Sequence, residues 1–535
     1  MLIHQNLLLI LSLFFLMALL YLLSQRWKIS YPIFLVIGGL VIGVVPGLPK
    51  VSLDPELVFL IFLPPLLFEA AWSSSWDQLW KWKRSILLLA FGLVLVTSAI
   101  VAYYAAALIP GFTLALGFLL GGIISPPDAV AATSVLKGMA VPRRGLAILE
   151  GESLVNDAAS LTVFRFAVAA VMTGQFVLRE AAVDFLVVAI MGALVGWVIA
   201  YILYVVLRYW ARASSITTPI TLIAPYLMYV VAEEFNWSGV LAVVSGGLFL
   251  SFRSSNYLNF ETRLQTKEVW QTVGFLLNGF VFILIGLELP VIVAGIKGYS
   301  MSDLINSTLL IAVIVIVIRI LVVYIAAFVP RILSRRIRAR EQPPGFKLPF
   351  IVGWAGMRGV VSLASALSIP IVLPSGEAFP ERNLIIFITF AVILITLVFQ
   401  GLTLPLFIRW LKVEEVDAYV PTDQQVATIR LELGRQVLDF LDSKYADDMK
   451  RYESIARIRE QNLLSITALE HTLQNMEDAN SFRSERKLYK QVMLEIVALR
   501  RESLQTMRGE KRYDDAVIRL LESNLDLEEA RLYRI

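Results

Sequence analysis

The sequence contains no cysteine and only two histidines, His4 and His471, neither of which lies in an apolar stretch. The absence of cysteine excludes disulfide bonds and thiolate metal sites. The scarcity of histidine excludes a zinc-dependent membrane enzyme of the H-E-x-x-H type. Because a G-x-S-x-G segment is also missing, the chain does not fit a membrane hydrolase. We therefore expect a protein that is not an enzyme and that uses no cofactor.

Charged residues are also scarce, at 17% of the 535 residues, whereas hydrophobic residues make up 58%. The mean hydropathy of +0.72 lies far above that of a soluble domain. The net charge of +4 is modest, and we expect no nucleic-acid partner. The first apolar run lacks a basic leader and an A-x-A cleavage site, which favours a retained membrane span over a signal peptide.

Repeated apolar runs of roughly 20 residues predict an all-α polytopic protein in the lipid bilayer, with about thirteen spans. From Lys412 onward, charged residues alternate with apolar residues at helical spacing, such as Leu488 and Val492. We therefore expect a transmembrane domain over 1–411 and a helical C-terminal tail over 412–535. The predicted spans are 6–24, 31–47, 54–72, 86–108, 112–135, 145–173, 181–207, 217–235, 238–252, 270–295, 304–328, 348–372 and 383–411.

Lysine and arginine are concentrated in alternate loops of this predicted topology. If the N-terminus lies outside, the outside loops hold only four basic residues: Lys50, Arg179, Lys297 and Arg382. Basic residues are enriched in the cytoplasmic loops of membrane proteins. The pattern therefore predicts a multi-pass protein of the cell membrane with an external N-terminus and a cytoplasmic tail.

Two of the predicted spans contain helix-breaking residues near their middle. The fifth span carries a Ser-Pro-Pro-Asp segment at 125–128, and the twelfth carries Gly353, Gly356 and Gly359 around Arg358. Adjacent prolines remove backbone donors, and glycines weaken a helix. If spans 1–6 and 8–13 form two halves, each break falls in the fifth span of its half. Broken helices at matching positions of two inverted repeats indicate a transporter binding site.

The sixth span carries acidic and polar residues at membrane depth, where a charge is costly. On a helix, Ser153, Asn156 and Asp157 share a face, because they lie three and four residues apart. Their hydroxyl, amide and carboxylate oxygens are ligands that suit a hard cation. The alternative is an ion pair that only fixes helix packing.

Other buried charges divide into candidates for the site and candidates for structure. Asp128 and Arg358 lie at the two breaks, where each can neutralise the exposed ends of helix dipoles. Glu69 follows a proline pair in the third span, and it must face a cavity or a cation. Glu152 points away from Asp157, and Arg358 is its predicted partner. Arg165 either balances the charge of the site or extends to the membrane surface. The remaining buried charges, for which packing pairs are the default, are Glu288 and Arg319.

Four segments, FLPPLLFEA, SPPDAVAA, GESLVNDA and GMRGVVS, occur in that order within 6–411. Together they resemble the monovalent cation:proton antiporter superfamily, in the branch of bacterial and eukaryotic sodium/proton exchangers. The resemblance implies a homodimer whose protomers each have a dimerisation domain and a mobile core that moves like an elevator. By motif, it implies cation and proton binding at Asp157, completed by Asp128, Glu69 and Ser153, with Glu152 and Arg358 as a structural pair.

The residues beside these positions refine the expected activity. Asn156 precedes the aspartate, as in the electroneutral branch of the superfamily. Pro127 stands where the family often has threonine, so that only a backbone carbonyl is available as a ligand there. We therefore expect electroneutral exchange of Na⁺ or Li⁺ for H⁺, with the ions as the only transported ligands. The alternatives are potassium/proton exchange and a membrane ion sensor that signals through the tail.

Overall fold

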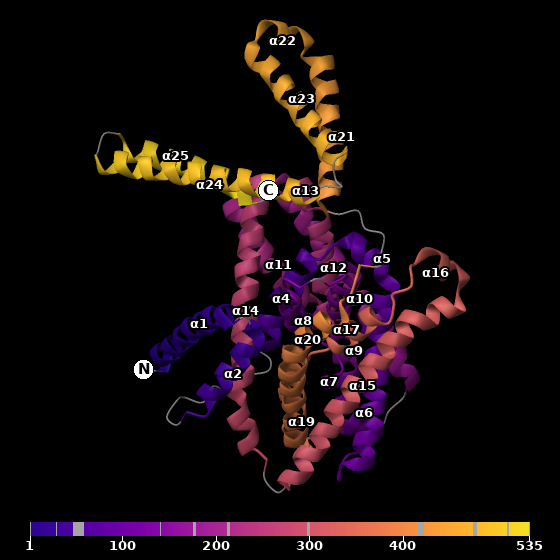
Figure 1. Cartoon of the computed structure of the whole chain (residues 1–535). Helices are drawn as coiled ribbons and strands as arrows, with labels where there is room; N and C mark the ends of the chain where they lie inside the picture. The colour runs from indigo at the N-terminus through magenta and orange to yellow at the C-terminus, as the bar shows by residue number, and fades with distance from the viewer. Residues whose placement is uncertain are drawn as a thin grey trace. The chain divides into compact units, whose positions relative to one another are not determined.

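The computed structural model describes residues 2–27, 29–45, 58–139, 141–174, 178–210, 214–296, 300–415, 422–474, 479–510 and 513–533. The described part is helical and contains no strand, apart from one isolated bridge between Val372 and Ala378. It divides into two compact units, Met1–Asp417 and Ala418–Ile535. The all-α fold class predicted from the sequence is confirmed (Figure 1).

The first unit contains the apolar helices. In chain order these elements are α1 (Leu2–Trp27), α2 (Tyr31–Gly43), η1 (Val58–Phe62), α4 (Leu63–Ser73), α5 (Trp76–Leu87), η2 (Leu88–Leu93), α6 (Val94–Leu108), α7 (Leu114–Ile124), α8 (Ala129–Leu136), α9 (Arg143–Thr173), α10 (Leu178–Tyr209), α11 (Ser214–Glu234), α12 (Gly239–Phe252), α13 (Ser254–Tyr257), α14 (Phe260–Ala294), α15 (Met301–Leu333), α16 (Arg335–Arg340), α17 (Lys347–Trp354), α18 (Val360–Leu367), α19 (Arg382–Ile395), η3 (Thr396–Gln400) and α20 (Gly401–Leu411).

Eight helices in the described part are long and apolar enough to cross a membrane, and four shorter apolar helices accompany them. The count of about thirteen spans stays a prediction. The helices α14 and α15 are longer than the spans predicted for them, because each continues into polar residues at one end. Parts of the predicted spans at 46–47 and 54–57, and the loop residues Lys50 and Lys297, lie outside the described residues.

Both predicted breaks are present. The fifth predicted span is split into α7 and α8, because the proline pair at 126–127 cannot continue a helix. The twelfth is split into α17 and α18 around 355–359. This span also ends at Leu367 rather than at the predicted residue 372, since Pro370 follows closely.

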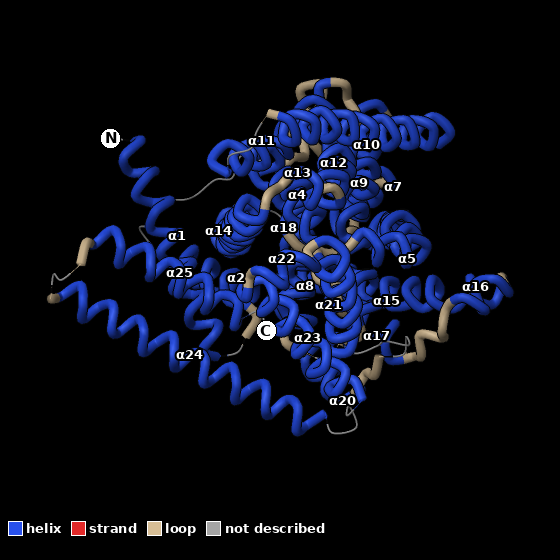
Figure 2. Tube along the Cα trace, turned by 90° about the horizontal axis from the view of Figure 1, so that it is seen from above, coloured by secondary structure: helices blue, strands red, loops and turns tan. Residues whose placement is uncertain are grey.

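The helix α9 lies at the centre of the first unit. It contacts α5, α7, α8, α17 and α18, so that both broken helices pack against it. Seen from above, α9 lies beside α7 and α12 (Figure 2). Small residues allow close packing nearby: a Cβ on Gly117 or Gly121 of α7 would lie 2.6–2.7 Å from backbone atoms of α6. A buried apolar cluster around α7, α9, α17, α18 and α19 surrounds the crossing of the broken helices. This packing fixes the positions of the two helix breaks relative to each other.

The second unit consists of two helical hairpins. Its helices are α21 (Thr422–Lys444), α22 (Ala446–Arg451), α23 (Glu453–Gln474), α24 (Ala479–Gly509) and α25 (Asp515–Tyr533). α21 packs against α23, and α24 packs against α25. Ion pairs join the helices of each hairpin; Arg459, for example, holds the pKa of Asp442 below its usual value by a hydrogen bond of 2.7 Å. The tail is therefore helical, as the sequence predicted.

Candidate functional site

The two breaks cross each other and are joined by a backbone hydrogen bond. The N–H of Asp128 donates to the carbonyl of Met357 at 2.7 Å. Four half-helix ends therefore meet at one point: the C-termini of α7 and α17, and the N-termini of α8 and α18. Each N-terminus has unsatisfied N–H groups and each C-terminus has unsatisfied carbonyls, so that the crossing needs both an anion and a cation.

Asp128 supplies the anion. Its carboxylate accepts from the backbone N–H of Val130 at 2.8 Å and of Ala131 at 3.4 Å, in the first turn of α8. It also lies against Gly359, immediately before α18, where a Cβ would come within 1.9 Å of its Oδ2. Asp128 thus lies at the positive ends of both half-helices, as the sequence predicted.

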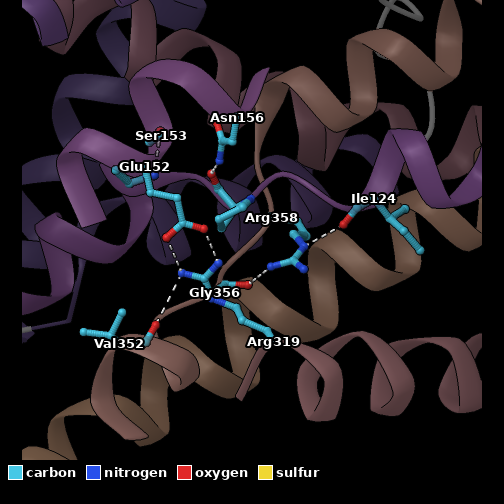
Figure 3. A network of polar contacts seen from close by, with 10 residues as sticks. Ile124, Glu152, Ser153, Asn156, Arg319, Val352, Gly356 and Arg358 are labelled. Carbon is cyan, nitrogen blue, oxygen red and sulfur yellow. Dashed lines mark hydrogen bonds and ion pairs between the residues drawn. The ribbon is translucent and has the colours of Figure 1, made fainter. Parts of the chain in front are cut away.

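Arg358 supplies the cation. Its Nε donates to the carbonyl of Ile124 at 2.7 Å, and its Nη1 donates to the carbonyl of Gly356 (Figure 3). Ile124 is the last residue of α7, and Gly356 follows α17 by two residues. The backbone N–H of Arg358 also donates to Thr396 Oγ1 at 3.1 Å. Arg358 therefore neutralises the C-terminal ends of the two broken helices.

The predicted pairing of Glu152 with Arg358 is wrong. Glu152 instead forms a two-pronged ion pair with Arg319 of α15, with N–O distances of 2.7 and 3.1 Å (Figure 3). Both side chains are 1% exposed, and Arg319 also donates to the carbonyl of Val352. Arg358 is already engaged by helix C-terminal carbonyls, and α15 brings a second arginine to the same place. The pair anchors α9 to α15 and α17.

Gly356 makes room for this ion pair, and this leads to a prediction. A Cβ at this position would lie 2.0 Å from Cδ and 2.2 Å from Nε of Arg319. We expect Gly356→Ala to destabilise the protein by about 1–3 kcal/mol, because the buried guanidinium must shift. Thermal unfolding of the purified full-length protein in detergent measures the effect.

Gly92→Ala is the matched control, because a Cβ on Gly92 would meet no atom within 4 Å. Its unfolding midpoint should stay close to that of the wild type. Equal midpoints for Gly356→Ala and Gly92→Ala would contradict the prediction.

The predicted ligand face of α9 does point towards the break between α7 and α8. Asn156 Nδ2 donates to the carbonyl of Pro127 at 3.0 Å, and Ser153 Oγ accepts from the N–H of Ala129 at 3.3 Å (Figure 3). Asp157 is only 8% exposed and lines a cavity. Within the part of the chain that the structure describes, its carboxylate makes no hydrogen bond, so its oxygens are available to a ligand.

The cavity connects these residues with Glu69. It is lined by Glu69 of α4, by Pro127 and Asp128 at the break, and by Ser153 and Asp157 of α9. Glu69 packs against Gly274 of α14, whose missing side chain leaves space for the glutamate. The cavity extends from the crossing to the ends of α8 and α20, where Lys137, Arg409 and Lys412 line it.

The carboxylates share the cavity without forming a compact metal centre. Over the described residues, no three His, Cys, Asp or Glu side chains lie close enough together to hold a metal ion. A cation bound at Asp157 would need other oxygen ligands. Ser153, which has a hydroxyl, and Pro127, which has a backbone carbonyl, line the same cavity.

Glu150 and Asn278 were left without a role by the sequence reasoning, and for Arg319 it expected by default a packing pair with no named partner. Arg319 pairs with the buried carboxylate of Glu152. Its position in an otherwise apolar span indicated that it needs such a partner. Glu150 and Asn278 both line the cavity; each is a polar residue in an apolar stretch, which is the same kind of signal. Arg165, for which two roles remained open, forms an ion pair of 2.5 Å with Glu233. The side chains of this pair are 47% and 29% exposed, so Arg165 is not a counter-charge of the cavity.

The sequence is similar to that of known proteins. The sequence model of the family described as "Sodium/hydrogen exchanger, transmembrane" matches residues 11–410. An uncharacterised Na⁺/H⁺ exchanger of Mycobacterium tuberculosis is 30% identical over 514 residues, covering 95% of this chain and 93% of the relative. A sodium, potassium, lithium and rubidium/H⁺ antiporter of Bacillus pumilus is 35% identical over 388 residues, covering 71% of this chain and 57% of the relative.

The fold also matches a solved structure. The sodium proton antiporter MjNhaP1 of Methanocaldococcus jannaschii superposes with a TM-score of 0.61 at 18% sequence identity. The match covers 77% of this chain and 100% of that protein. This likeness supports the arrangement of the helices.

Proposed function

The chain belongs to the sodium/hydrogen exchanger family, and from this premise we propose that it exchanges Na⁺ or Li⁺ for H⁺ at Asp157. Burial disfavours the charged form of a carboxylate, which then holds either a proton or a cation. If the site crosses the membrane only when it is occupied, one ion is exchanged for the other. The protein is a multi-pass membrane antiporter, and no step of this mechanism is enzymatic.

The observation that carries the proposal is the environment of Asp157. It lines the cavity, it lies beside the crossing of the broken helices, and no described residue occupies its oxygens by a hydrogen bond. Asp128, by contrast, is held by two backbone N–H groups of α8. Of these two carboxylates, Asp157 is therefore the one that can exchange its ligand.

The other predicted site residues receive distinct roles in this proposal. Ser153 Oγ and the Pro127 carbonyl supply oxygen ligands, and Glu69 attracts the cation from across the cavity. Asn156 holds the Pro127 carbonyl in place through its hydrogen bond of 3.0 Å. Because Asn156 is neutral, the site has a single exchanging charge at this position, and this favours one-for-one, electroneutral exchange.

We further propose a homodimer in the cell membrane with an external N-terminus and a cytoplasmic tail. The concentration of lysine and arginine in alternate loops supports this orientation, and the family resemblance supports the dimer. The cavity reaches the ends of α8 and α20, on the side from which the chain leaves for the tail. In this orientation the structure is open towards the cytoplasm.

Potassium/proton exchange is the second candidate. The relative from Bacillus pumilus is named for sodium, potassium, lithium and rubidium, and it is 35% identical over 388 residues. Carbonyl and hydroxyl oxygens suit several alkali cations, so the ligand set by itself does not select one.

Pulses of Na⁺, Li⁺ and K⁺ given to proteoliposomes that contain a pH-sensitive dye test the proposal. We expect proton movement with Na⁺ and Li⁺ across a range of pH, and a rate that does not change when a membrane potential is imposed. Choline pulses and protein-free liposomes are the controls. A response to K⁺ alone would establish the second candidate. A rate that follows the membrane potential would rule out one-for-one exchange, and silence with all three cations would exclude antiport.

A further inference from the structure

Two arginines meet at the ends of α10 and α12, outside the cation site. Arg208 lies in the last turn of α10, and Arg253 directly follows α12. The two helices pack closely, because a Cβ on Gly196 of α10 would lie 1.9 Å from the carbonyl of Ala242 (Figure 2). Their C-terminal ends are therefore side by side, and the two side chains extend from the same end of this pair.

The two guanidinium groups lie close to one tyrosine side chain. Arg208 Nη1 donates to Tyr204 Oη, and the guanidinium carbon of Arg208 lies 5.7 Å from the ring centre of Tyr204. The guanidinium carbon of Arg253 lies 5.4 Å from the ring centre of Tyr204 and 5.2 Å from that of Phe249. The guanidinium groups of both arginines therefore pack against aromatic rings.

No carboxylate balances this pair of charges within the described residues. Arg208 lies against the rings of Tyr204 and Tyr209, and neither arginine has an ion-pair partner among the described residues. A helix C-terminus favours a nearby cation, which accounts for each arginine separately. It does not account for two like charges that lie close to one neutral tyrosine ring, since such charges repel each other. An oxyanion placed between them would remove this repulsion.

The surroundings indicate where such an oxyanion comes from. Large aromatic side chains are exposed at the same helix ends: Tyr209 at the end of α10, Trp210 directly after it, and Phe252 at the end of α12 are 61–83% exposed. Trp76 of α5 packs against Phe252, with ring centres 6.0 Å apart. Tryptophan and tyrosine side chains gather at the depth of the lipid headgroups. The arginine pair therefore lies where phosphate groups of the bilayer are found.

We propose that Arg208 and Arg253 bind a phosphate oxyanion, presented by the headgroup of an anionic phospholipid. The planar guanidinium offers parallel N–H donors that match phosphate oxygens, and two such groups can hold one phosphate from both sides. When no phosphate is present, Tyr204 accepts a hydrogen bond from Arg208 and its ring lies beside Arg253. The bound lipid would fasten the ends of α10 and α12 to the membrane surface.

Delipidated full-length protein in detergent, titrated with phosphatidylglycerol at constant ionic strength, tests this site. The thermal unfolding midpoint should rise with lipid concentration and give an apparent dissociation constant. We expect this constant to increase at least about tenfold in the double variant Arg208→Gln/Arg253→Gln, which loses the charged hydrogen-bond donors. If the double variant does not fold, the two single variants replace it, and each should weaken binding on its own.

Arg263→Gln/Lys267→Gln is the matched control. It removes two exposed positive charges from α14, which lie outside the arginine pair, and should leave the dissociation constant unchanged. Phosphatidylcholine and inorganic phosphate distinguish the sources of the anion: a lipid site requires weak responses to both. If inorganic phosphate raised the unfolding midpoint as much as phosphatidylglycerol does, the arginines would bind phosphate, but the proposal of a lipid ligand would be wrong. Unchanged lipid binding in the arginine variants, or an equal loss in both double variants, would overturn the proposal.

Discussion

The substitution Asp157→Asn is expected to reduce sodium-driven proton movement in proteoliposomes to the level of protein-free vesicles. The amide has nearly the same shape as the carboxylate, but it carries neither a negative charge for the cation nor a proton to exchange. No described residue hydrogen-bonds to the Asp157 carboxylate, so its replacement breaks no hydrogen bond of the described chain. The loss should therefore be one of transport, with the unfolding midpoint preserved. The dye response to Na⁺ and Li⁺ pulses measures it.

Asp184→Asn is the control for this substitution. Asp184 is exposed on α10, and the same chemical change there should leave transport intact. Asp157→Glu keeps a titratable group at a shifted position and should retain part of the activity. Sodium-driven exchange that persists in Asp157→Asn, while the wild type transports normally, would remove Asp157 from the mechanism but leave the antiport function standing.

Breaking the buried ion pair of Glu152 and Arg319 is expected to have the largest effect on stability. Glu152→Gln leaves the guanidinium of Arg319 in a position 1% exposed to solvent, without its counter-charge. Removing one partner of such a pair typically costs about 3–5 kcal/mol, because the remaining charge stays buried and unpaired. Arg319→Gln should be comparably destabilising. The midpoint of thermal unfolding in detergent, together with the monodisperse yield, measures both variants.

Two further variants make this test specific. The double variant Glu152→Gln/Arg319→Gln removes both charges and should recover much of the lost stability. Arg165 lies on α9, as Glu152 does, and forms a more exposed ion pair with Glu233 of α11. Arg165→Gln breaks that pair and should cost no more than about 1 kcal/mol. If Glu152→Gln and Arg165→Gln lowered the midpoint equally, the buried pair would not be the anchor that we infer.

The helix breaks could be predicted because their causes are local. A proline pair at 126–127 removes hydrogen-bond donors wherever the chain is folded, and the structure ends α7 at Ile124 for this reason. The compensating charges were also predictable. A break requires an anion at the N-terminal ends and a cation at the C-terminal ends, and Asp128 and Arg358 lie within the breaks themselves.

The partner of Glu152 could not be predicted in this way. Glu152 and Arg319 lie 167 residues apart, and their meeting depends on how α9 and α15 pack. Arg358 was the nearer choice by motif, yet the carbonyls of Ile124 and Gly356 hold it. The ion pair of Arg165 with Glu233 and the convergence of Arg208 with Arg253 depend on the packing of helices in the same way.

The sequence by itself therefore determined that this chain forms membrane helices, where two of them break and which carboxylate faces the break, because apolar runs, prolines and helical spacing act over a few residues. Only the tertiary structure decided which cation meets which anion. Charges attract over distances longer than one helical turn, and helix packing selects among several possible partners.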